Sequence, residues 1–102
     1  MTDRELLELA AKAAGYNAFL GHAEQMMDSG WNPLEDDGDA LRLAVSLGII
    51  VHPDRHEERS IAEWGDADQA VETWHGIRNQ GADAATRRAI VRAAAEIGRV
   101  KT

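Results

Sequence analysis

The sequence predicts a small α+β domain in which about three helices pack on a small antiparallel or mixed β-sheet. Apolar residues repeat at helical spacing near both ends of the chain and once in its middle, short β-branched or alternating runs lie between them, and Gly or Pro marks the junctions. With 102 residues, of which 44% are apolar and 28% charged, the chain has the size and composition of one globular domain. We therefore assign residues 1–102 to a single domain.

The first helix is expected to begin directly after Thr2. With Thr2 as the N-cap, Glu5 stands three residues later and completes a capping box. The apolar stripe that follows at helical spacing consists of Leu6, Leu9, Ala10 and Ala13. Gly15 is expected to end the helix, and the stripe is expected to face the core rather than a partner.

Residues 16–34 are expected to form a short strand, an irregular segment and then a turn. The strand would lie at residues 16–20, although Leu20, Ala23 and Met27 also suit a helical turn. Pro33 disfavours the α conformation of Asn32, so no helix should pass through this point.

An acidic run over residues 35–39 is expected to open the second helix, because carboxylates are favourable at a helix N-terminus. Residues 40–47 are almost wholly apolar on both sides and contain Arg42 as their only charged residue, which predicts a buried helix that the following glycine stops. The β-branched run at residues 49–51 then predicts a central strand, which His52-Pro53-Asp54 should end.

Residues 59–64 and 70–75 alternate loosely and are separated by Gly65-Asp66, a pattern typical of a β-hairpin. A helix over residues 66–78 is the alternative, because the apolar residues there also fit a 3.6-residue period. The hairpin is the interpretation that we prefer.

The last helix is expected over residues 83–98, with Asp83 as its cap and Gly98 at its end. Its apolar stripe consists of Ala85, Ala89, Ile90, Ala93 and Ile97. Arg88 and Arg92 lie four residues apart on another face of the helix.

Two segments resemble parts of small uncharacterised phage and prophage proteins. They are residues 31–45, WNPLEDDGDALRLAV, and residues 84–98, AATRRAIVRAAAEIG; the start of the chain, TDRELL at residues 2–7, is also similar. The resemblance implies a phage accessory protein and carries over no activity and no functional residue. We expect such a protein to bind a host or phage protein, with a homodimer left open. A counter-defence inhibitor of the anti-CRISPR or anti-restriction type, mimicking DNA through acidic side chains, is the alternative.

No catalytic, cofactor or metal motif stands out. Cysteine is absent, and none of the serines lies in a Gly-x-Ser-x-Gly elbow; they are Ser29, Ser46 and Ser60. His52 and His56 have acidic neighbours, but Pro53 between them prevents a shared helical face, so a polar loop is expected. The acidic run before the second helix also lacks the spacing of a calcium loop. We therefore expect no enzyme, cofactor or metal, and a small metal-dependent enzyme is only a remote alternative.

The net charge of −7 disfavours binding to the phosphates of nucleic acids, although residues 81–102 are locally basic. The candidate interaction surface consists of Arg87, Arg88, Arg92, Trp31, Trp64 and Trp74. The structural alternative is that these arginines are solvated, with their positive charge favourable in the C-terminal half of the helix. No apolar run is long enough for a membrane span and no signal peptide is recognised, so we expect a cytoplasmic protein without membrane contact.

Overall fold

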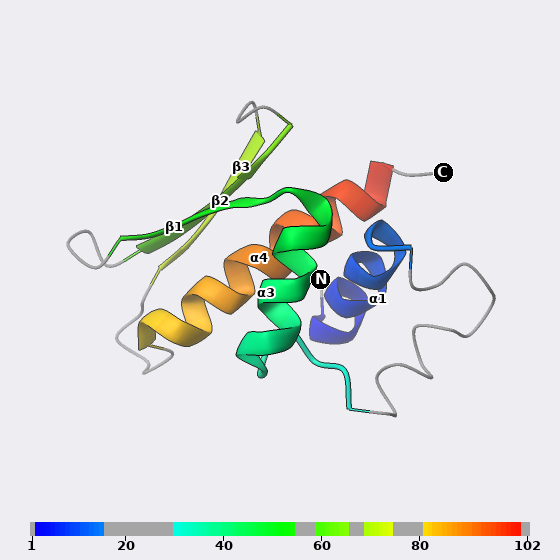
Figure 1. The fold of residues 1–102 in the computed structure, drawn as a ribbon, viewed down its shortest axis with the longest axis horizontal. Coiled ribbons are helices and arrows are strands. Elements are labelled where there is room, and N and C mark those ends of the chain that lie inside the picture. Colours follow the sequence, from blue (N-terminus) through cyan, green and yellow to red (C-terminus); the bar gives the residue numbers. More distant parts are fainter. Residues whose placement is uncertain (1, 16–29, 55–58, 66–68, 75–80, 101–102) are drawn as a thin grey trace.

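The described residues contain three helices and a three-stranded antiparallel sheet, which confirms the α+β prediction. The computed structural model describes residues 2–15, 30–54, 59–65, 69–74 and 81–100 (Figure 1). The elements are α1 (Asp3–Ala13), α3 (Asp37–Leu47), β1 (Ile50–Asp54), β2 (Arg59–Trp64), β3 (Gln69–Trp74) and α4 (Gly81–Val100). The strand expected near residues 16–20 lies outside the described residues. The turn expected by residue 34 is present, since Pro33 begins a turn that leads into α3.

Helix α4 is the central element and contacts the sheet, α1 and α3 (Figure 1). The apolar stripe predicted for it is present, but the buried surface is wider. Val91, Ala94 and Ala95 are also buried. The reason is that α4 has neighbours on more than one side, and its many alanines let these neighbours approach closely. A one-sided stripe is the pattern of a helix that covers a core, whereas α4 lies within it.

The sheet has the strand order β1-β2-β3, and its inner face packs on α4. The hairpin predicted for the second half of the chain is confirmed as β2 and β3, and the alternative helix over residues 66–78 is wrong for β3. Ser60 and Ala62 of β2 are fully buried against α4, and the Ser60 hydroxyl lies 2.7 Å from the Thr86 hydroxyl. These alternate residues of β2 therefore define the inner face of the sheet.

Strand β1 lies at an edge of the sheet, so the prediction of a central strand is wrong. Among the described strands it pairs with β2 alone, and it includes His52-Pro53-Asp54, the residues expected to end it. Ile49 is buried, but Ile50 is 47% exposed. A β-branched apolar run is typical of a strand covered on both faces, whereas this one has α4 on a single face. Pro53 is compatible with the edge because no ladder hydrogen bond is needed on its outer side.

Helix α1 begins as predicted. The Thr2 hydroxyl accepts from the Glu5 amide at 3.1 Å, and the Glu5 carboxylate accepts from the Thr2 amide at 3.2 Å. The hydrogen bond from the Thr2 amide, together with that from its hydroxyl, lowers the pKa of Glu5 below its ordinary value. Gly15 follows the C-cap with a φ of 80°, which confirms it as the residue that ends the helix.

Helix α4 departs from its predicted ends at both sides. It begins at Gly81, so Asp83 lies in its first turn and is not the cap. It also runs past Gly98 to Val100. Gly98 is buried against α1, where a methyl group would overlap the carbonyl group of Leu9 and press on the backbone nitrogen of Ala13. This glycine is therefore required for the close approach of two helices and does not terminate one.

Helix α3 is amphipathic, which corrects the prediction of a helix buried on both sides. Ala40, Leu43 and Ala44 are buried, whereas Leu41 and Val45 are 63% and 73% exposed. The helix packs on α4 through one face, and among the described residues no other element covers its second apolar face.

Candidate interaction surface

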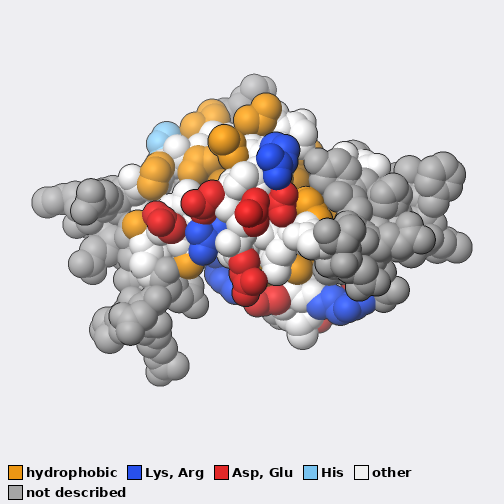
Figure 2. Space-filling model, turned by 60° about the horizontal axis from the view of Figure 1, so that its bottom comes forward, with side chains coloured by type: hydrophobic (Ala, Val, Ile, Leu, Met, Phe, Trp, Pro, Cys, Tyr) orange, Lys and Arg blue, Asp and Glu red, His pale blue; other side chains and the backbone are white. Residues whose placement is uncertain are grey.

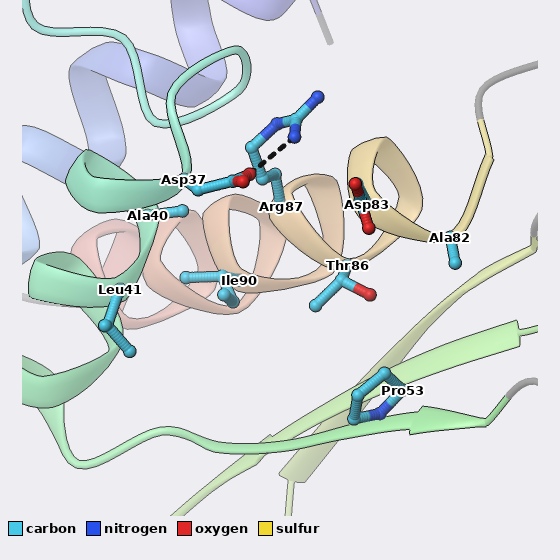
Figure 3. Close-up of a pocket in the computed structure, with 9 residues that line it drawn as sticks. All are labelled: Asp37, Ala40, Leu41, Pro53, Ala82, Asp83, Thr86, Arg87 and Ile90. Atoms are coloured by element: carbon cyan, nitrogen blue, oxygen red, sulfur yellow. Dashed lines mark hydrogen bonds and ion pairs between the residues drawn. The ribbon is translucent and has the colours of Figure 1, made fainter.

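Arg87, one of the predicted interaction residues, holds the start of α3 against α4. Its Nε donates to the carbonyl oxygen of Leu34 at 2.9 Å, and its Nη1 donates to Oδ1 of Asp37 at 2.6 Å (Figure 3). The Arg87 side chain is 19% exposed, whereas that of Asp37 is 77% exposed. The guanidinium is thus largely committed within the chain, while the carboxylate reaches solvent.

Arg88 and Arg92 tie α4 to two further elements. Arg88 donates two hydrogen bonds to the carboxylate of Asp3 in α1, at 3.0 and 3.2 Å. Arg92 donates to the carbonyl oxygen of Glu72 in β3 at 2.6 Å. The structure therefore directs the arginines to α3, α1 and β3 and does not gather them into one basic patch. These contacts favour the structural interpretation of the arginines over partner binding.

The structure describes the side chains of two of the three predicted tryptophans. Trp31 and Trp64 are partly buried and pack against the hydrophobic core. Trp74 stands opposite Arg59 in the pairing of β2 with β3, and its side chain lies outside the described part of the structure.

The acidic run serves the start of α3, as the sequence predicts. Asp36 is the N-cap, and its Oδ2 accepts from the Asp39 amide at 2.7 Å. Asp39 in turn accepts from the amide of Asn32 at 2.9 Å and from Arg42 at 2.7 Å. With Asp37 bonded to Arg87, each of the three aspartates holds a neighbouring segment in place.

The histidines and serines considered for metal binding or catalysis have partners within the fold where the structure describes them. Nε2 of His52 lies 3.4 Å from a carboxylate oxygen of Glu63 on the next strand, while His56 is outside the described residues. In the described ranges no three His, Asp or Glu side chains come together as metal ligands. The Ser46 hydroxyl donates to the carbonyl oxygen of Leu43, and the buried Ser60 pairs with Thr86.

An open cavity of about 380 Å³ lies between α3 and β1, with α4 as its floor (Figure 3). Leu41 of α3 and Pro53 of β1 face each other across it, and Thr86 and Ile90 of α4 lie beneath them. We call this cavity the α3–β1 groove. Its lining residues are Asp37, Ala40, Leu41, Pro53, Ala82, Asp83, Thr86, Arg87 and Ile90.

The lining of the α3–β1 groove is largely apolar and includes two acidic residues and one basic residue. Asp37 and Asp83 both line it, and Arg87 is the basic residue among the lining side chains. Asp83 is exposed, and no interaction of its carboxylate with another described residue is seen. On the face that Figure 2 shows, hydrophobic side chains lie beside acidic and basic ones.

Leu41 and Val45 are the functional candidates that the sequence prediction placed in the core. They lie four residues apart and so share one face of α3. Among the large apolar side chains of the described residues, Leu41, Val45, Ile50 and Val100 are exposed, and the first three belong to α3 and β1. The signal was present in the sequence, because residues 40, 43, 44 and 47 already form one complete stripe and leave residues 41 and 45 on a second.

Comparison with known proteins finds no matching family model, no matching curated protein and no matching solved structure. In the part of the chain that the structure describes, no helix combines the length and the apolar character that crossing a membrane requires.

Proposed function

We propose that this protein acts without catalysis, by binding another protein through α3 and the α3–β1 groove. The observation that carries the proposal is the exposure of Leu41 and Val45 beside an open, largely apolar cavity. Burying a side chain of this kind contributes about 1.5–3 kcal/mol. Clustered exposed apolar side chains with a polar rim are typical of protein-binding sites.

The resemblance to phage and prophage proteins supports a host or phage protein as the partner, met in the bacterial cytoplasm. Both resembling segments contribute to the groove. Residues 31–45 supply its α3 wall, and residues 84–98 supply most of its floor. A phage accessory protein gains from such a surface because occupying one site on a large host protein can be enough to block it.

The counter-defence alternative through DNA mimicry draws less support. A mimic needs carboxylates that stand free along a surface, so that a DNA-binding protein accepts them as phosphates. Asp37 and Asp39 are each paired with an arginine, and Glu72 is paired with Arg59 at 3.3 Å. Such pairing lowers the negative potential that mimicry requires.

The experiment is site-specific photocrosslinking in bacterial cells. A photoreactive amino acid replaces Val45 in one variant and Val100 in the other. Val100 is the matched control, because it is 75% exposed but lies at the far end of α4. We expect one discrete crosslinked protein from position 45, absent from position 100 and lost when Leu41→Glu is added. Equal products from both positions, or no product from position 45, would refute the proposal.

A further inference from the structure

The α3–β1 groove has an unpaired strand along one wall. Among the described residues β1 pairs with β2 on one side, and no strand pairs with its other side. Pro53 carries no amide hydrogen, and a proline in an edge strand places its nitrogen on the outer side. Because backbone groups alternate along a strand, Val51, two residues earlier, directs its N–H and C=O to that same side. The edge therefore offers three backbone groups for pairing, which are the N–H and C=O of Val51 and the C=O of Pro53.

The short connection between α3 and β1 favours an extended chain over a helix as the occupant of the groove. Gly48 and Ile49 alone separate the end of α3 from the start of β1, so the two walls converge at that end. A strand added to a sheet lies about 4.8 Å from its neighbour, whereas a helix with side chains is about 10–12 Å across. Addition of an extended peptide to a sheet edge is a common mode of peptide recognition.

The lining of the groove specifies which side chains the extended chain must carry. Leu41, Pro53 and Ile90 suit an apolar side chain that points inward. Asp83 and the outer oxygen of Asp37 suit a basic side chain next to the apolar one. A second copy of this chain is a poor occupant, because each copy carries a net charge of −7 and has Asp37 and Asp83 in the lining of its groove.

We propose that the α3–β1 groove binds an extended segment of a partner protein, which adds to β1 as a fourth strand and carries an apolar side chain next to a lysine or arginine. This inference rests on the proposed function and names the chemistry of the partner. The backbone of Val51 holds the segment, the groove takes the apolar side chain, and Asp83 pairs with the basic one. Ionic pairing at a rim sets selectivity and association rate more than total affinity.

The test begins with selection of peptides from a random decapeptide display library on the immobilised full chain. The selected peptide is then synthesised and used as the probe in two measurements. Amide hydrogen exchange by NMR reports whether the peptide protects the Val51 N–H. Titration with Asp83→Lys, and with Glu96→Lys as the control at the other end of α4, reports the role of charge at the groove.

We expect selected sequences that pair an apolar with a basic residue, slower exchange at Val51, and about fivefold weaker binding to Asp83→Lys with no change for Glu96→Lys. Replacing the basic residue of the peptide by Glu should restore binding to Asp83→Lys. Peptides that bind as helices, that leave Val51 exchange unchanged, or that bind both variants equally would overturn the inference. A dimer of this chain that Leu41→Glu dissociates would also overturn it.

The two proposals fail in different ways. A crosslink from position 45 together with unprotected Val51 leaves the binding function standing and removes the added strand. If a peptide binds in the groove but no crosslink forms in cells, the groove binds such segments and the proposed cellular function is wrong.

Discussion

Replacing Gly98 by alanine tests the close contact between α1 and α4. In a helix interior alanine is favoured over glycine by about 1 kcal/mol, so an exposed site would gain stability. At Gly98 the added methyl group meets the backbone of Leu9 and Ala13, which cannot move aside as a side chain would. The methyl group would therefore force α1 and α4 apart, and the packing between the small buried residues of these two helices would be lost.

The two effects oppose each other, and the steric one is larger. Overfilling a packed interior costs about 1–3 kcal/mol, and the upper value applies when the obstacle is backbone. After subtraction of the gain in helix propensity, Gly98→Ala should lower the free energy of unfolding by about 2 kcal/mol. For a domain of this size that corresponds to a fall in Tm of about 10 °C.

Urea and thermal unfolding followed by circular dichroism measure this loss. Gly38→Ala in α3 is the matched control, because its methyl group would lie 3.2 Å from Oδ2 of Asp36 and 3.3 Å from Nη1 of Arg42, both on side chains. The control should lose much less stability than Gly98→Ala, because the ends of the Asp36 and Arg42 side chains can shift to admit the methyl group. Adding Leu9→Ala to Gly98→Ala should not restore stability, since the overlap is with the Leu9 backbone. Unchanged stability of Gly98→Ala, or equal effects at both glycines, would refute the reasoning.

Three further substitutions test contacts within the fold. Asp36→Ala removes the N-cap of α3 and should cost about 0.5–2 kcal/mol in urea unfolding; a loss below that range would mean that the cap is dispensable. The lowered pKa of Glu5 contributes stability that is present above its unfolded-state pKa and lost as pH falls through its folded-state pKa, so Glu5→Gln should flatten the dependence of unfolding on pH in acid. Equal acid sensitivity of the two proteins would contradict this. Arg87→Lys keeps the charge but cannot reach both Leu34 and Asp37 with the same geometry, and it should lower Tm by several degrees, about 1 kcal/mol; an unchanged Tm would show that charge alone suffices.

Local signals in the sequence determined most of the secondary structure. The capping box at Thr2 and the aspartates before α3 place donors and acceptors within three residues of one another, so their pairing needs no tertiary partner. The hairpin of β2 and β3 follows from alternation on both sides of Gly65. The α+β class follows from the order of these periodic segments.

The tertiary structure decided which apolar faces are covered. Residues 40–47 and 49–51 are apolar enough for burial on both sides, but α4 offers a single contact face to each, so Leu41, Val45 and Ile50 stay exposed. The same packing converts Gly98 from an apparent helix stop into a contact with α1. It also turns Arg87, Arg88 and Arg92 of α4 toward α3, α1 and β3. Composition and periodicity report how much apolar surface an element has, and the number of neighbours that cover it depends on residues far away in the chain. For this reason the groove between α3 and β1, which carries the proposed function, emerged from the assembled fold and not from a motif.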